Sequence, residues 1–350
     1  RPNALQRAAF EEIAAGRDAI LHAWTGSGKT LAFLLPLLER LDPKERSPQL
    51  LILCPSRELA FQIARVAEMV LAGSGMSAAA VVGGANPNRQ LEKIKKERPS
   101  VIVGTPGRVC ELAFDWQKLK LQRIRHVVID EVDAALKPPH LDHCQQLLHS
   151  TQDGRPLQLV LASATADTPP VRRVAAQLLK SPLMLRLRPP ASSADGGTGD
   201  DANDDAGDED GGGNAEGGLS ALGAQLPSSI THGLMVISPN KGLKQVHALH
   251  HTTPSPKCLV FVNSPYRVKM VCERLESQYN LQAVPLYGEQ EREERVDVMR
   301  KLLDGTARLA VSTEMGARGL DIPGLSHVVN LELPTDPSHY VHRAGRCGRA

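Results

Sequence analysis

Aromatic residues are scarce in this chain, since phenylalanine, tyrosine and tryptophan together make up 3% of its 350 residues. Single-stranded nucleic acids are often bound by stacking their bases on aromatic rings, so stacking is disfavoured here as the main binding mode. If the partner is a nucleic acid, we expect contacts to phosphate and sugar instead. No apolar run approaches the roughly 20 residues that span a bilayer, so we expect no membrane segment.

Cysteines are few and unclustered. The six of them form no CxxC pair, which disfavours a disulfide scaffold and is typical of reduced thiols in an intracellular protein. The composition does not distinguish nucleus, cytoplasm and organelle. No signal peptide is present, but the sequence begins at Arg1 rather than at Met, so we expect a fragment from which a targeting segment can be missing. The sequence also stops at Ala350, so we expect the last elements of a second domain to lie beyond it.

The charge is unevenly distributed although the net charge is only +2. Residues 191–218 hold nine acidic residues and no Lys or Arg, and without these nine charges the rest of the chain carries +11. This excess fits a polyanionic partner, with a merely basic, soluble surface as the alternative. Residues 189–226 have almost no large apolar side chains to offset their ordering entropy, so we expect a disordered linker. This linker is expected to separate a first domain at 1–188 from a second domain at 227–350. Its acidic run is expected to be a solvated spacer rather than a mimic of nucleic acid.

The stretch from Ala23 to Thr30 reads AWTGSGKT and lies between an apolar run that resembles a strand and one that resembles a helix. A strand, a glycine loop and a helix in that order form a phosphate cradle, because glycines let backbone N–H groups approach an anion. Lys29 supplies positive charge for the β- and γ-phosphates, and the hydroxyl of Thr30 suits Mg²⁺. A glycine-rich turn that caps an ordinary helix is the alternative for this stretch alone.

Apolar runs, polar turns and helical patterns alternate through both halves of the chain. This alternation predicts doubly wound parallel sheets, whose ligands bind beyond the carboxyl ends of the strands. The pair Asp130-Glu131 follows one such strand, with a solvated turn as the alternative. Strands are expected at 19–23, 50–54, 78–82, 101–104, 126–129, 157–162, 258–262, 283–286, 309–313 and 327–330. Helices are expected at 5–15, 56–71, 90–98, 267–275 and 291–303, and after the glycine loop and Arg108.

The order of the motifs resembles that of a DEAD-box RNA helicase, a superfamily 2 ATPase with two RecA-like domains. The resemblance covers nearly the whole chain outside the acidic segment. It rests in the first half on the end of a Q motif (2–6), AWTGSGKT, PSRELA (55–60), Gly83-Gly84, TPGR (105–108), DEVD (130–133) and SAT (163–165). In the second half it rests on Phe261 with Ser264, STEMGARGLD (312–321) and HRAGRCGR (342–349). The family pattern is altered at Val132, Tyr287, Arg292 and Glu314, where Ala, His, Gln and Asp are usual.

The resemblance implies an ATP-dependent RNA helicase that uses ATP and Mg²⁺ and couples RNA-stimulated hydrolysis to local unwinding or remodelling of RNA–protein complexes. Single-stranded or short-duplex RNA is then bound mainly through its sugar-phosphate backbone. Glu131 is implied as the general base, Lys29 as the phosphate ligand, and Arg346 and Arg349 as arginine fingers. The implied nucleotide-binding residues are Gln6, Thr25, Gly26, Ser27, Gly28, Lys29, Thr30, Asp130 and Asp321, of which Thr30 and Asp130 also hold Mg²⁺. The implied coupling residues are Asp133, Ser163, Thr165, His342 and Arg343. The implied RNA ligands are Arg57, Gly84, Gln90, Thr105, Arg108, Arg295, Thr313 and Gly316.

Other functions remain open at this point. An ATP-gated RNA clamp with slow turnover is compatible with the substitutions at Val132, Arg292 and Glu314, whereas the intact catalytic set favours an enzyme. A DNA helicase is disfavoured by Gln6 and TPGR. Two groups have the helical spacing of zinc ligands but no matched partner cluster, so a solvated helix face is favoured for both. These groups are His247, His250 and His251, and His140, His143 and Cys144.

Overall fold

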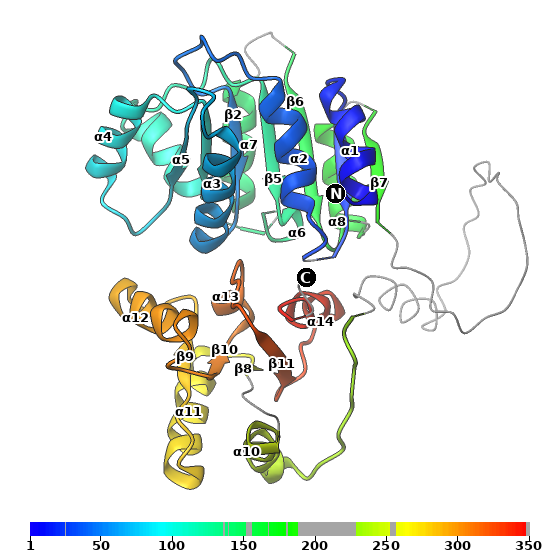
Figure 1. Ribbon diagram of the computed structural model, residues 1–350, viewed down its shortest axis with the longest axis vertical. Coiled ribbons are helices and arrows are strands. Elements are labelled where there is room, and N and C mark those ends of the chain that lie inside the picture. The colour runs from blue at the N-terminus through cyan, green and yellow to red at the C-terminus, as the bar shows by residue number, and fades with distance from the viewer. Residues whose placement is uncertain are drawn as a thin grey trace, which may run out of the picture.

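The computed structural model describes residues 1–24, 26–135, 137–138, 140–151, 156–166, 168–179, 181–187, 229–252 and 257–347. These residues form two α/β domains, one above the other in Figure 1. The expected linker at 189–226 lies outside the described residues. In the described part of the chain, no helix is both long and apolar enough to cross a bilayer.

The first domain alternates strands and helices along its whole length. Its strands are β1 (Ala19–His22), β2 (Leu50–Leu53), β3 (Ala78–Val81), β4 (Val101–Gly104), β5 (His126–Asp130), β6 (Gln158–Ser163) and β7 (Leu183–Arg186). Its helices are α1 (Ala4–Ala14), α2 (Lys29–Glu39), α3 (Arg57–Leu71), α4 (Pro87–Glu97), α5 (Pro106–Cys110), α6 (Val132–Ala135), α7 (His140–Thr151) and α8 (Pro169–Leu178). A π-helical turn, η1 (Glu111–Asp115), follows α5.

The seven strands form a parallel sheet in the order β3-β4-β2-β5-β6-β1-β7. Strands β5, β6 and β1 are therefore neighbours, although the sequence separates them widely. All carboxyl ends of a parallel sheet meet at one edge. The turns after these three strands, which carry DEVD, SAT and the glycine loop, are brought together there.

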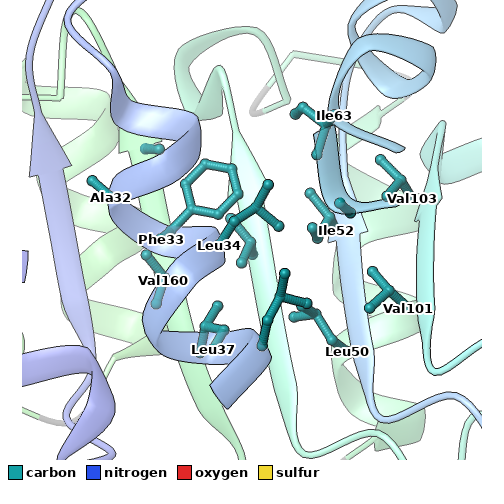
Figure 2. Packing of buried hydrophobic residues seen from close by; sticks show 14 of the residues in the cluster. Ala32, Phe33, Leu34, Leu37, Leu50, Ile52, Ile63, Val101, Val103 and Val160 are labelled. Atoms are coloured by element: carbon teal, nitrogen blue, oxygen red, sulfur yellow. The ribbon is translucent and has the colours of Figure 1, made fainter. Parts of the chain in front are cut away.

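Both faces of this sheet are covered by helices. Leu50 and Ile52 of β2 pack in a cluster with α1, α2 and α3, while Leu51 and Leu53 pack on the opposite face. Alternate side chains of a strand point to opposite faces, so a strand buried on both sides must be apolar throughout. Figure 2 shows the first cluster, with Phe33 of α2 among residues of α3, β2, β4 and β6.

The second domain has a smaller parallel sheet in the order β11-β8-β10-β9. Its strands are β8 (Lys257–Phe261), β9 (Val284–Leu286), β10 (Leu309–Ser312) and β11 (Leu325–Asn330). Its helices are α10 (Gly242–Thr252), α11 (Pro265–Tyr279), α12 (Arg292–Leu303), α13 (Glu314–Ala317) and α14 (Pro337–Ala344), with a 3₁₀ turn, η2 (Pro239–Lys241), before α10.

The expected fold class is confirmed, and each expected strand is present with shifts of one or two residues at its ends. The helix expected from 90 begins three residues earlier, because Asn86 caps it and Pro87 takes its first turn. The sequence analysis anticipated α7 and α10 only as helix faces and missed α6, α8, α13, α14 and β7. Strand β7 is short and only partly buried at the sheet edge, so its apolar signal is weak.

Candidate active site

The glycine loop runs from β1 into α2. Gly28 caps α2 with a φ of 84°, a left-handed conformation that favours glycine. A Cβ atom at this position would lie 2.5 Å from Nε2 of Gln6, so a larger residue does not fit. Lys29 donates from Nζ to the carbonyl oxygens of Ala23 and, at 3.2 Å, Trp24. Burial lowers the pKa of Lys29, and the nearby carboxylates, Asp130 first, oppose this shift.

The start of α1 holds the same loop. Asn3 donates to the carbonyl of Ser27 at 2.7 Å, and Nε2 of Gln6 donates to the carbonyl of Gly28 at 3.3 Å. Asn3 and Gln6 also cap α1 reciprocally, each side chain accepting from the other's backbone N–H at 2.9 Å. The sequence analysis missed Asn3, although an Asn followed three residues later by Gln is the spacing of a capping box.

An acidic pair lies at the end of β5. Asp130 is 4% exposed, and burial raises its pKa to about 6, opposed chiefly by the charge of Lys29. Glu131 has a φ of 49° and donates its backbone N–H to Oδ1 of Asp130 at 2.9 Å. Non-glycine residues rarely adopt this conformation, and such strain concentrates at functional sites.

The residues of the loop and of β5 fit a metal-bound phosphate on two observations. The hydroxyl of Ser27 is buried and has no hydrogen-bond partner in the described part of the chain. The buried Asp130 carboxylate gains stability in its charged form from a nearby cation. Thr30, in the first turn of α2, adds a hydroxyl of the kind that hard cations bind.

A chain of polar contacts links the first domain to the second. Ser163, at the end of β6, donates to Asp133 at 2.5 Å and accepts from the backbone N–H of Thr165 at 2.9 Å. Asp133 in turn lies 3.6 Å from Nε2 of His342 on α14. Four of the five expected coupling residues are therefore contiguous. Arg343 is the exception, because its guanidinium donates within the second domain, to Asn263, Asn330 and the carbonyl of Glu332.

Arg346 directs a guanidinium from the second domain to the end of β5. Its Nη2 atom lies 4.0 Å from Oε1 of Glu131, and its side chain is 5% exposed. Hydrogen bonds to the carbonyls of His342 at 3.0 Å and Leu320 at 3.4 Å fix its direction. Arg349 and Thr25 lie outside the described residues. Asp321 is exposed in the middle of the loop between α13 and β11.

Glu314 forms the centre of a polar cluster between the domains. It lies 2.6 Å from Nδ1 of His339, 4.0 Å from Nδ1 of His342 and 3.0 Å from Nη2 of Arg318. Burial opposes ionisation, but hydrogen bonds from the two histidines and the charge of Arg318 hold the pKa of Glu314 well below its usual range. On its other side, Nε2 of His339 lies 3.3 Å from Nζ of Lys137 in the first domain. The sequence analysis missed His339 and Lys137, which belong to no motif.

The first-domain residues expected to bind RNA gather around the turn after β3. Thr105 accepts from the backbone N–H of Gly83 at 3.2 Å, and Gln90 donates to the carbonyl of Val82 at 2.8 Å. The Arg57 side chain lies against Gly84, where a Cβ would collide with its guanidinium. Arg108 donates to the carbonyl of Ala85 at 2.8 Å and lies 2.8 Å from Glu111. The turn is therefore braced from three neighbouring elements.

Of the second-domain residues in this set, Arg295 is 8% exposed and joins the domains. It donates to Oε1 of Glu58 on α3 at 2.5 Å and to the carbonyl of Gly316 at 2.9 Å. Thr313 caps α13 by accepting from the N–H of Gly316 at 3.1 Å. The sequence analysis did not anticipate that the guanidinium of Arg295 donates its hydrogen bonds to protein groups.

Gly319 strengthens this contact between the domains. Its φ is 67°, and a Cβ there would lie 2.8 Å from the backbone nitrogen of Leu59 in the first domain. Only glycine fits this approach. The sequence analysis did not single it out, although it stands within STEMGARGLD.

The two groups with metal-ligand spacing lie on α7 and α10. No cluster of three His, Cys, Asp or Glu residues suited to a metal occurs among the described residues. The expected solvated face is wrong for Cys144, which is 3% exposed in the core of the first domain. In the other group, the rings of His247 and His251 meet edge to face, with centroids 4.3 Å apart and an interplanar angle of 61°.

The fold and the site together define the class of protein. A glycine loop opening a helix, an acidic pair at the end of a strand of the same sheet and an arginine from a second domain are the parts of a P-loop nucleoside triphosphatase. The two parallel sheets, joined across polar contacts, make it one with tandem RecA-like domains.

Comparisons with known proteins identify the family. The DEAD/DEAH box helicase model matches residues 3–174, and the helicase conserved C-terminal domain model matches residues 241–350. The chain is 33% identical to the DEAD-box ATP-dependent RNA helicase CshC of Bacillus cereus, covering 99% of this chain and 78% of that protein. It is also 33% identical to the probable ATP-dependent RNA helicase YfmL of Bacillus subtilis, covering 100% and 82%. The chain belongs to the DEAD-box family of ATP-dependent RNA helicases.

A solved structure agrees with this assignment. Dbp5 of S. cerevisiae bound to RNA and ADP BeF3 matches with a TM-score of 0.81 at 26% identity, over 100% of this chain and 81% of that one. The expected fold, enzyme class and ATP dependence are therefore confirmed.

Proposed function

We propose that ATP hydrolysis in this helicase takes place between the glycine loop and Glu131, and that Arg346 completes the site from the second domain. The observation that carries the proposal is the 4.0 Å approach of the Arg346 guanidinium to Glu131 across the domain boundary. An arginine there neutralises charge that develops as the terminal phosphoryl group is transferred. Arg349 is proposed as a second finger on the motif alone.

The other residues of the site have distinct parts in this proposal. The loop amides and Lys29 bind the phosphates, and Glu131 accepts a proton from the attacking water. Gln6 binds the adenine edge and Asp321 the ribose, as the family resemblance implies. Thr30 and Asp130 hold Mg²⁺, which supplies charge neutralisation at the phosphates when bound.

We further propose that the RNA lies across both domains and is held through its backbone. The supporting features are the clustered turn after β3, with Arg57, Gly84, Gln90, Thr105 and Arg108, and the low aromatic content. Thr313, Gly316 and Arg295 of the second domain are buried here and are assigned to the RNA contact on the family resemblance alone. Relatives of this chain bound to RNA support the choice of partner. The free cysteines support the proposal of an intracellular enzyme.

The substitution Glu131→Gln tests the proposed base. It keeps the shape of the side chain but removes its basicity, so we expect hydrolysis to fall at least about 100-fold while ATP and RNA still bind. The measurement is ATP turnover together with retention of labelled RNA in the presence of ATP, and retention should lengthen. Hydrolysis at the wild-type rate would show that another group is the base.

An RNA clamp with slow turnover remains the second candidate. The observation that favours it is the Glu314 cluster, in which His339, a residue outside the motifs, contacts both Glu314 and Lys137 of the first domain. Such contacts slow the reopening of the domains. Duplex unwinding assayed beside ATP turnover separates the two, since a clamp hydrolyses ATP slowly without releasing strands.

A further inference from the structure

A groove of about 450 Å³ lies beside β3, outside the proposed ATP site. β3 is one of the two edge strands of the first sheet, and its three alanines line the floor. Phe61 and Arg65 of α3 form one wall, and Arg89 and Lys93 of α4 form the other. The small side chains leave the strand backbone close to the surface of the groove.

The outer edge of β3 presents unpaired backbone groups. Ser77 and Val81 accept hydrogen bonds from Val101 and Thr105 of the neighbouring segment, at 3.2 and 3.0 Å. Alternate residues of a strand direct their N–H and C=O groups to opposite sides, so Ala78, Ala80 and Val82 direct theirs into the groove. A strand edge of this kind is a template for pairing with another chain.

Side chains already occupy both ends of this edge. Glu68 accepts from the N–H of Ala78 at 2.7 Å, and Gln90 donates to the carbonyl of Val82 at 2.8 Å. Between them, the N–H and C=O of Ala80 have no partner outside the sheet in the described part of the chain. Oε1 of Gln90, which also lines the groove, is buried and lacks a partner there.

The walls of the groove are apolar and basic. Phe61 is 53% exposed. Within the described residues, no acidic group lies within ion-pair distance of Arg65 or Arg89, whereas Lys93 lies 3.6 Å from Glu97. Among the described residues that line the groove, Glu68 is the only acidic one, and it already accepts a hydrogen bond from the backbone N–H of Ala78. The walls therefore complement an apolar segment with negative charges.

We propose that this groove binds an extended acidic peptide, which adds a strand to β3. Its backbone pairs with Ala80, alternate apolar side chains pack on Phe61 and the alanines, and its carboxylates face Arg65 and Arg89. The open backbone groups favour a polypeptide over RNA, because a sugar-phosphate chain offers no alternating amide donors and acceptors. Gln90 lines the groove and also belongs to the proposed RNA-binding surface. A peptide bound in the groove would therefore lie next to the RNA and could change RNA affinity.

Peptide selection on the intact chain tests this proposal. A phage-displayed library of random peptides of about a dozen residues, long enough for one strand, is enriched on the wild type and depleted on Ala80→Pro. Proline removes the N–H that faces the groove but no hydrogen bond to β4, a position where edge strands tolerate it. The peptides recovered should alternate apolar residues and carry net negative charge.

Matched variants then measure the affinity of a recovered peptide by fluorescence anisotropy. We expect Ala80→Pro, Phe61→Ala and Arg65→Glu each to weaken binding about tenfold or more. Met69→Ala, an exposed residue of α3 that does not line the groove, should leave binding unchanged. The substitutions at Phe61 and Arg65 keep the test valid if proline perturbs the fold.

Three results would overturn the proposal: no peptide that survives depletion, recovered peptides of net positive charge, or affinities insensitive to Phe61→Ala and Arg65→Glu. A fall of about tenfold in affinity for single-stranded RNA in Arg65→Glu and Arg89→Glu, without peptide binding, would assign the groove to RNA instead. None of these results depends on ATP hydrolysis, so they leave the proposed function intact.

Discussion

The two domains contribute differently to the site. In the first, the glycine loop, Asp130 and the Asp133–Ser163 pair are held by groups of the same domain. In the second, His342 and Arg346 are fixed on or beside α14 and reach Asp133 and Glu131 across the boundary. The first domain is therefore organised to bind the nucleotide by itself, and the second to make its hydrolysis depend on how the domains meet.

The largest expected effect comes from Arg346→Ala, which should separate binding from chemistry. Arginine fingers contribute about 10³-fold or more to turnover in P-loop enzymes, so kcat should fall by about that factor. ATP affinity should change little, because the first domain holds the phosphates. Turnover and nucleotide titration measure the two quantities. Arg300→Ala, at an exposed position on α12, is the control, and an equal loss of affinity in Arg346→Ala would refute the division of roles.

Acid should destabilise the first domain through a buried histidine. His126 is 6% exposed, and burial lowers its pKa to about 4. The unfolded chain binds a proton between about pH 6.5 and pH 4 that the folded chain does not. The contribution of His126 to the free energy of unfolding should therefore fall by about 3 kcal/mol as the pH drops through this window. Asp130, whose pKa is raised to about 6, changes stability in the opposite sense, so the His126 contribution is measured as the difference between the wild type and a His126 variant.

Denaturant unfolding at several pH values measures this loss. In His126→Gln the loss of unfolding free energy that His126 causes at low pH should disappear. His149 is exposed, so His149→Gln should keep the wild-type dependence of unfolding free energy on pH. A wild-type slope retained in His126→Gln would mean that other groups carry the acid sensitivity.

Arg295 should act through the contact between the domains. Removing either Arg295 or Glu58 leaves the partner's charge largely buried and without its ion pair, so each alanine substitution should lower RNA-stimulated turnover about tenfold. The double variant should be little worse than either single one. If Arg295 instead contacts a phosphate, Arg295→Ala alone will flatten the salt dependence of RNA binding by about one unit, and Glu58→Ala will not.

Lys137 should have the smallest effect of this group. It is exposed, and its hydrogen bond to His339 is worth about 0.5–1.5 kcal/mol at most. RNA-stimulated kcat/KM should fall about threefold in Lys137→Ala and remain unchanged in Lys118→Ala, an exposed lysine of the first domain. An effect as large as that of Arg295→Ala would mean that the Glu314 cluster, rather than Arg295, dominates the contact.

The sequence predicts the binding half of this molecule better than the coupling half. Local spacing is enough to identify the glycine loop, because its strand, glycines and helix are consecutive. The same reasoning places Asp130 and Ser163 at strand ends. It also predicts that they meet, since parallel strands share one edge.

The contacts between the domains cannot be predicted from local spacing or strand order. The pairing of Arg295 with Glu58 joins residues 237 positions apart, and the hydrogen bond of Lys137 to His339 joins residues 202 apart. No periodicity or motif links them, because their proximity follows from how two separately folded sheets are placed. The left-handed conformation of Glu131 is likewise a consequence of tertiary packing, not of propensity.

The most direct test of the whole account is steady-state ATP turnover by the intact chain with and without single-stranded RNA. RNA that spans both domains should bring Arg346 to Glu131, so turnover should rise at least about tenfold in the wild type. Arg346→Ala should give the same low rate in both conditions. Equal wild-type rates with and without RNA would contradict the claim that the second domain completes the active site.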